Sequence, residues 1–149
     1  MRFVLVITAA VLTSVSTAFA ANTEKILNTQ EMTALAAKAA QATPKEQCYL
    51  YAQLVSAMTE IASRQVSAGD TAEASASLKS IQEYTEKIHS GISDNSKKLK
   101  DAQIMMRRTA FRLKELMRDG SFENQAAFEA TLKELDQVQS QMMLAVFQK

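Results

Sequence analysis

The fold is decided by residues 70–120, DTAEASASLKSIQEYTEKIHSGISDNSKKLKDAQIMMRRTAFRLKELMRDG. Apolar or small residues recur there at alternating steps of three and four, a spacing that keeps a stripe on one face of a helix and approaches a coiled-coil seam. The stripe consists of Leu78, Ile81, Thr85, Ile88, Ile92, Asn95, Leu99, Ala102, Met106, Thr109, Leu113 and Leu116. We therefore predict one long central helix over residues 70–119.

Both ends of this helix carry boundary signals. Asp70 with Glu73 three residues later is the pattern of a capping box. Gly120 can take the left-handed conformation that follows a last helical turn. The polar segment 90–96, with Gly91 inside it, leaves two alternatives open: a kink near Gly91, or two helices joined by a loop. The stripe keeps its phase across this segment, which favours a single helix.

The first twenty residues have the three parts of a secretory signal peptide. Arg2 supplies the positive charge, residues 3–15 form the apolar region, and Ala18 and Ala20 frame an A-x-A cleavage site. We expect cleavage after Ala20, which would leave the protein periplasmic or secreted. No second hydrophobic segment follows, so no transmembrane segment is expected in the mature chain.

The remaining residues, 21–149, have the composition of a single all-α domain. The whole chain contains three glycines and one proline, so few residues interrupt helices. Its 17 basic residues against 16 acidic ones become equal numbers once Arg2 is removed. A balanced charge gives no argument for nucleic acid, and export argues against it.

Three further helices are predicted around the central one. The first is capped by Asn22 or Thr23 and runs to about residue 41. The second begins at Thr43 with Pro44 in its first turn and a capping-box Glu46, and ends at residue 69. The last is capped by Ser121, and its stripe is Phe128, Leu132, Leu135, Val138, Met142 and Val146. Short connections predict an antiparallel bundle of four helices built on the long central helix.

The chain has few groups for catalysis or cofactor binding. His89 and Cys48 are the single histidine and the single cysteine, and nothing in the sequence fixes their distance. We predict no enzyme, no catalytic residue and no cofactor. The weak alternative is a small metal- or haem-binding bundle, because thioethers bind Cu(I) and a haem can use histidine with methionine. Its candidate ligands are Met105, Met106, Met142, Met143 and His89.

Cys48 is a lone cysteine in a protein predicted to be exported. An unpaired cysteine in an oxidising compartment raises the alternative of an intermolecular disulfide. Free cysteines are also among the residues most often buried, and Cys48 can share the apolar side of Tyr51 and Ala52. Burial is the favoured interpretation.

Basic residues concentrate in the second half of the central stretch. Residues 97–118 contain eight basic and two acidic residues, and the heptad-spaced Lys100, Arg107 and Lys114 form a ridge. This ridge can match acids on the last helix, namely Glu123, Glu129, Glu134 and Asp136. It can also dock an acidic partner, an anionic lipid or a polyanion. The partner-binding candidates are Lys100, Arg107, Arg108 and Lys114.

A resemblance supports the predicted class. At Cys48-Tyr49-Leu50-Tyr51, residues 97–100, residues 107–113 and residues 132–136, the chain resembles small exported helical proteins of soil bacteria. Those proteins carry no assigned function, so the resemblance implies an exported helical protein and supplies no site residue. Exported chaperones of the long-hairpin type are a looser comparison, and their L-T-x-x-Q repeats are absent here.

These observations together favour an exported, non-enzymatic interaction or scaffold protein of the bacterial cell envelope. A long seam with few chemical groups suits binding through helix faces, to a protein partner or to a second copy in a homodimer. A periplasmic chaperone-like binder is a further alternative.

Overall fold

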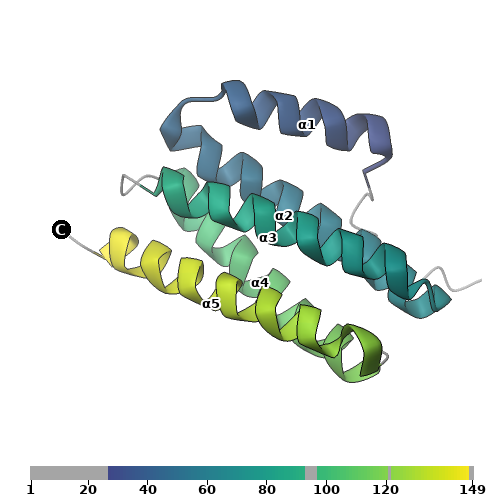
Figure 1. The fold of residues 1–149 in the computed structure, drawn as a ribbon. Coiled ribbons are helices and arrows are strands. Elements are labelled where there is room, and N and C mark those ends of the chain that lie inside the picture. The colour runs from purple at the N-terminus through teal and green to yellow at the C-terminus, as the bar shows by residue number, and fades with distance from the viewer. Residues whose placement is uncertain (1–26, 93–96, 121, 148–149) are drawn as a thin grey trace, which may run out of the picture.

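A computed structural model describes residues 27–92, 97–120 and 122–147, and all of its regular structure is helical (Figure 1). The elements are α1 (Thr29–Gln41), α2 (Pro44–Ala68), α3 (Thr71–Gly91), α4 (Lys97–Asp119), the 3-10 helix η1 (Phe122–Asn124) and α5 (Gln125–Phe147). The all-α prediction is confirmed. The predicted signal peptide, and the predicted caps Asn22, Thr23 and Ser121, lie outside the described residues.

The central stretch is two helices, so the prediction of one long helix and of four helices in all is wrong. α3 ends at Gly91 and α4 begins at Lys97. The predicted stripe is nevertheless buried in both halves, from Leu78 to Ile88 in α3 and from Leu99 to Leu116 in α4. Each half faces the same core, so the apolar spacing reports burial within each helix and not continuity between them.

The helix ends differ from the predicted caps in their chemistry. α1 begins at a capping box that the sequence analysis missed, in which Asn28 and Glu31 each accept a hydrogen bond of 2.9 Å from the other's backbone N–H. Thr43 is the N-cap of α2 and Pro44 is its first residue, as predicted, but the Thr43 side chain makes no capping hydrogen bond. Asp70 likewise precedes α3 without a side-chain cap.

Two glycines at the same end of the bundle, one after α2 and one after α4, act in different ways. Gly69 has a left-handed backbone (φ 78°) and closes α2, with the Gly69 and Asp70 N–H groups donating back to Val66 and Gln65. Gly120 does not have a positive φ, so its predicted left-handed cap is wrong. A Cβ on Gly120 would lie 3.3 Å from the Phe128 ring, so glycine is needed there for close packing.

Consecutive helices form two antiparallel hairpins, α2 with α3 and α4 with α5. In the first hairpin, Ser77 donates a hydrogen bond of 2.6 Å to Gln65 near the turn, and the Cys48 thiol lies 3.7 Å from the Ile88 carbonyl oxygen at the far end. In the second hairpin, Lys114 lies 3.8 Å from Asp136. These pairs show that the two helices of each hairpin run antiparallel, and they give the register between them.

Between the hairpins the neighbouring helices are parallel, which differs from the predicted antiparallel bundle. α2 packs on α4, and α3 packs on α5. Along α3 and α5, Ser75 bonds to Asn124 at 2.6 Å, and Gln82 bonds to Thr131 at 2.8 Å. α1 packs on α2 on the outside of this arrangement (Figure 1). None of the helices in the described ranges is long and apolar enough to cross a membrane.

Candidate functional site: the groove between α2 and α4

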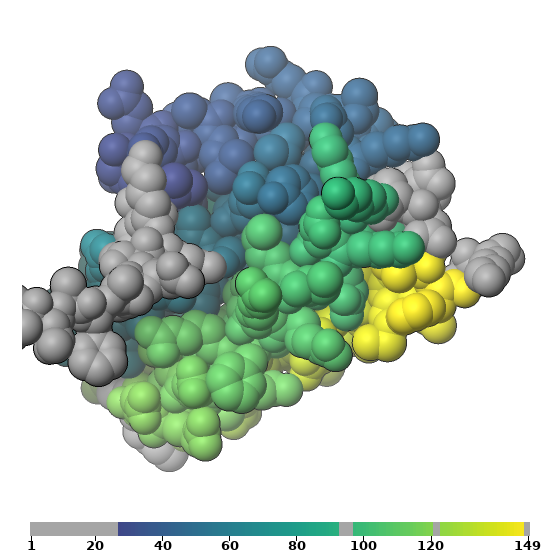
Figure 2. Space-filling model, turned by 180° about the vertical axis from the view of Figure 1, so that it is seen from behind, coloured from purple at the N-terminus to yellow at the C-terminus, as the bar shows by residue number. Residues whose placement is uncertain are grey.

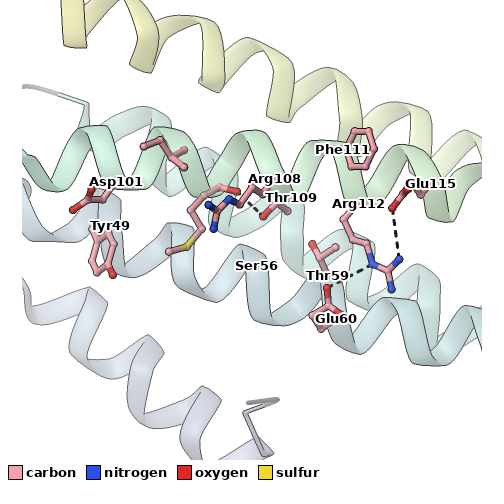
Figure 3. Close-up of a pocket in the computed structure, with 12 residues that line it drawn as sticks. Tyr49, Ser56, Thr59, Glu60, Asp101, Arg108, Thr109, Phe111, Arg112 and Glu115 are labelled. Carbon is pink, nitrogen blue, oxygen red and sulfur yellow. Dashed lines mark hydrogen bonds and ion pairs between the residues drawn. The ribbon is translucent and has the colours of Figure 1, made fainter. Parts of the chain in front are cut away.

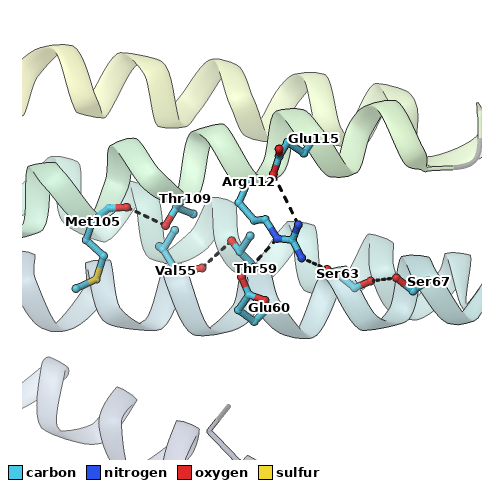
Figure 4. Close-up of polar contacts among 9 residues, drawn as sticks. All are labelled: Val55, Thr59, Glu60, Ser63, Ser67, Met105, Thr109, Arg112 and Glu115. Carbon is cyan, nitrogen blue, oxygen red and sulfur yellow. Dashed lines mark hydrogen bonds and ion pairs between the residues drawn. The ribbon is translucent and has the colours of Figure 1, made fainter. Parts of the chain in front are cut away.

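Arg112 joins α4 to α2 at one end of a groove (Figure 4). Its guanidinium donates a hydrogen bond of 2.9 Å to the Ser63 hydroxyl on α2. The same group lies 3.6 Å from Glu60 on α2 and 3.7 Å from Glu115 on its own helix. A planar guanidinium with several donors suits such a shared position. Arg112 therefore closes this end of the groove, and its guanidinium is occupied by contacts within the protein.

The floor of the groove is formed by short side chains, which leave space between α2 and α4. Thr59 on α2 and Thr109 on α4 are almost completely buried. Each hydroxyl donates to its own helix, Thr59 to the Val55 carbonyl at 2.9 Å and Thr109 to the Met105 carbonyl at 3.0 Å (Figure 4). The floor is therefore polar in composition but has its hydrogen bonds satisfied within the protein.

The groove has a volume of about 500 Å³ and runs along both helices (Figure 3). Its lining is Tyr49, Ser56, Thr59, Glu60, Asp101, Ile104, Met105, Arg108, Thr109, Phe111, Arg112 and Glu115. Tyr49 also lines a second cavity of about 380 Å³, where Lys38 of α1 and Lys98 of α4 approach. Tyr49 therefore lies between the two cavities.

Two large apolar side chains stand exposed at the α4 rim of this groove. Ile104 is 47% exposed and Phe111, seven residues later, is 64% exposed. Exposed positions of this kind are informative when they cluster, since single exposed apolar residues are ordinary. Arg108 lies between them on the same rim, and it forms no ion pair within the described part of the chain. The rim therefore combines apolar contact area with a free positive charge.

The predicted basic ridge is exposed along α4, and its residues differ in whether they form ion pairs. Lys114 pairs with Asp136 of α5, one of the acids predicted to match the ridge. Lys100 and Arg107 are exposed and form no ion pair with any residue of the ranges described. Lys98 pairs with Glu46 at the start of α2, and this ammonium holds the pKa of the Glu46 carboxyl below its usual range. Of the four partner-binding candidates, Lys114 is thus paired with an acid of α5. Lys100, Arg107 and Arg108 form no ion pair within the described residues.

The metal-ligand candidates are not brought together. Met106 and Met142 are fully buried in the core, whereas Met105 lines the groove and Met143 is exposed. His89 is exposed and hydrogen-bonds to Gln141 of α5. Within the described ranges no group of three or more histidine, cysteine or acidic side chains is placed to hold a metal ion. Core packing accounts for the two buried methionines.

Cys48 is buried at 3% exposure, the arrangement that the sequence analysis favoured. Its thiol points to the Ile88 carbonyl, and burial raises the pKa of the Cys48 thiol. His89 is directed toward α5 instead, so the two residues do not form a nucleophile pair. An intermolecular disulfide at Cys48 would require α3 to move away from α2.

A smaller cavity of about 280 Å³ lies between α3 and α5. Glu86 of α3 and Glu134 of α5 both line it. Partial burial, with the nearby Glu86 charge, raises the pKa of the Glu134 carboxyl. Two carboxylates in one cavity repel each other, so this cavity weakens the α3–α5 contact at neutral pH.

Ile104 and Phe111 were not predicted as site residues from the sequence. Both lie outside the buried stripe, at heptad spacing, inside the most basic segment of the chain. That combination is a usable signal, because a large apolar residue on the polar face of a helix has no core to fill. The α2 side of the groove was missed because the predicted arrangement did not place α2 beside α4.

No protein-family model, no curated protein and no solved structure matches this chain. The function of the protein is therefore inferred from the geometry of the groove and its rims.

Proposed function

We propose that the protein is an exported, non-enzymatic interaction protein of the bacterial cell envelope, and that it binds an acidic segment of a partner protein in the groove between α2 and α4. The observation that carries the proposal is the α4 rim, where Ile104 and Phe111 are exposed on either side of Arg108. Aromatic residues and arginine are enriched among the residues that contribute most to binding at protein interfaces.

The sign of the partner's charge is inferred from the rim and the ridge, whose cations form no ion pair within the described residues. The groove lining itself contains Glu60 and Glu115, which lie beside Arg112, and Asp101. Arg108 on the rim, with Lys100 and Arg107 on the neighbouring ridge, attracts a negatively charged segment and speeds its encounter. A helix or an extended peptide with an apolar side chain flanked by carboxylates would satisfy both features of the rim. The groove volume of about 500 Å³ gives room for a few such side chains.

The test is site-specific photo-crosslinking in an exporting host, with the photoreactive residue at position 111 and, as the matched control, at the exposed position 79 on α3. The expected result is one acidic protein crosslinked from position 111 and not from position 79. That protein, once purified, should bind the wild type and lose about tenfold or more in affinity to Phe111→Ser or Arg108→Glu. If both variants bound this protein as tightly as the wild type does, the groove would be refuted as the binding site.

A further inference from the structure

The exposed large apolar side chains of the described chain all lie on α4 and α5. Besides the two at the groove rim, they are Met143, Leu144 and Phe147, with exposed fractions of 41%, 63% and 76%. These three occupy the last two turns of α5. A cluster so exposed in a small protein marks a surface that contacts something apolar.

The register of the second hairpin brings the basic ridge to this cluster. α4 and α5 run antiparallel, and Lys114 pairs with Asp136 across them. Seven residues earlier in α4 and seven later in α5, Arg107 lies level with Met143. Figure 2 shows this face, with the end of α5 (yellow) beside the first half of α4 (green). We name the surface formed by Lys100, Arg107, Met143, Leu144 and Phe147 the α4–α5 seam.

Acidic residues are segregated away from the seam. The last eleven residues of α5, 137–147, carry no charge of either sign. In the first half of α4 the single acid is Asp101, and it lines the groove on the α2 side. The seam is therefore cationic and apolar together, and Lys100 and Arg107 form no ion pair within the described residues.

We propose that the α4–α5 seam docks the protein on the surface of an anionic phospholipid bilayer. The interface of such a bilayer offers phosphate groups and acyl chains at neighbouring depths, and it accepts cationic and apolar side chains side by side. Lys100 and Arg107 have long aliphatic stems, so their charges reach phosphates while Leu144 and Phe147 enter the apolar region. A bilayer needs no complementary pocket, which suits protruding side chains at a helix end. Lys100 and Arg107 belong both to this seam and to the ridge beside the groove, since Arg107 and Phe111 are four residues apart on α4, whereas Met143, Leu144 and Phe147 belong to the α4–α5 seam alone.

The test is co-sedimentation of the protein, recovered from an exporting host, with phosphatidylcholine vesicles that either contain or lack phosphatidylglycerol. We expect binding to the anionic vesicles, release by added salt, and little binding to the neutral ones. The double variants Leu144→Ser/Phe147→Ser and Lys100→Glu/Arg107→Glu should each lower partitioning about tenfold or more. All four positions are exposed, and thermal unfolding of each variant verifies that the fold is retained.

A matched control separates the seam from the total charge. Lys79→Glu on α3 reverses another exposed charge, and this variant should bind anionic vesicles like the wild type. Equal binding to neutral vesicles, or wild-type binding by both seam variants, would overturn the proposal. Self-association without vesicles that Phe147→Ser abolishes would assign the seam to a second copy instead, and would also overturn it.

Discussion

The Arg112 guanidinium on α4 donates a hydrogen bond of 2.9 Å to the Ser63 hydroxyl on α2 and lies 3.6 Å from the Glu60 carboxylate. It is one of the polar contacts that hold the two hairpins together. Ser63 is 7% exposed, so a lost partner there is not fully replaced by water.

Replacing Arg112 with methionine should therefore destabilise the protein by about 1 kcal/mol, since the aliphatic stem is kept and the hydrogen bond is lost. The measurement is urea unfolding at neutral pH. Arg108→Met is the matched control, because Arg108 lies one turn earlier without an ion pair in the described chain, and it should change stability by less than about 0.5 kcal/mol. Equal effects from the two substitutions would show that the Ser63 contact does not stabilise the fold.

Adding a methyl group to Gly120 should destabilise the protein by about 1–3 kcal/mol. A Cβ there would lie 3.0 Å from the Leu116 carbonyl oxygen and 3.3 Å from the Phe128 ring. Gly91→Ala is the control, because its Cβ would meet the Cys48 sulfur at 3.4 Å, an ordinary contact. Thermal unfolding of the two variants should separate them clearly, and a tolerated Gly120→Ala would contradict the close packing at this turn.

Cys48 should make stability fall at alkaline pH. Burial raises the pKa of its thiol, so above the ordinary value of 9.0 the unfolded chain releases this proton while the folded chain keeps it. Stability from this group is present below pH 9.0 and is lost as the pH rises. Cys48→Ala lacks the titration, so the stability gap between wild type and variant should shrink between about pH 8 and pH 10. A constant gap would show that the thiol ionises equally in both states. Burial also raises the pKa of Tyr84, but that residue is common to both proteins.

Glu134→Gln should stabilise the protein slightly at neutral pH, by less than about 0.5 kcal/mol for so exposed a pair. The pKa of Glu134 is raised by partial burial and by Glu86, so the charged form is disfavoured in the folded state. The sign is opposite to that of an ion-paired carboxylate: the wild type recovers stability as the pH falls toward the ordinary pKa of 4.5. The difference between wild type and variant should therefore vanish in acid. Unfolding at pH 7 and in mild acid measures it, and a variant that gains stability in acid would contradict the assignment.

The buried face of each helix could be read from the sequence, and the break in the central stretch could not. Leu78, Ile88, Leu99 and Leu116 all lie in the core as the stripe predicts. In the sequence the stripe continues in phase through residues 92–96, although α3 ends at Gly91 and α4 begins at Lys97. The spacing of apolar residues does not depend on the direction in which the chain runs. It therefore cannot distinguish one long helix from two helices between which the chain reverses direction.

The pairing between hairpins was also beyond the sequence. Lys114 was correctly matched to acids of the last helix, because adjacent helices joined by a short turn must pack together. The Arg112 contact with α2 depends on which faces meet after the chain reverses near Gly91. That choice is made by tertiary packing across the whole bundle, and no local spacing records it.

Parallel packing of the hairpins has a consequence for the rate of folding. The hydrogen bonds Ser63–Arg112, Ser75–Asn124 and Gln82–Thr131 each join residues 49 positions apart, whereas the Ser77–Gln65 bond beside the first turn spans 12. Contacts of low sequence separation cost less loop-closure entropy, so each hairpin can form before the two dock. Docking of the two hairpins on each other is then the late step of folding. Stopped-flow kinetics of Arg112→Met should show faster unfolding at a nearly unchanged refolding rate, so the residence time of the native state is set where the hairpins meet.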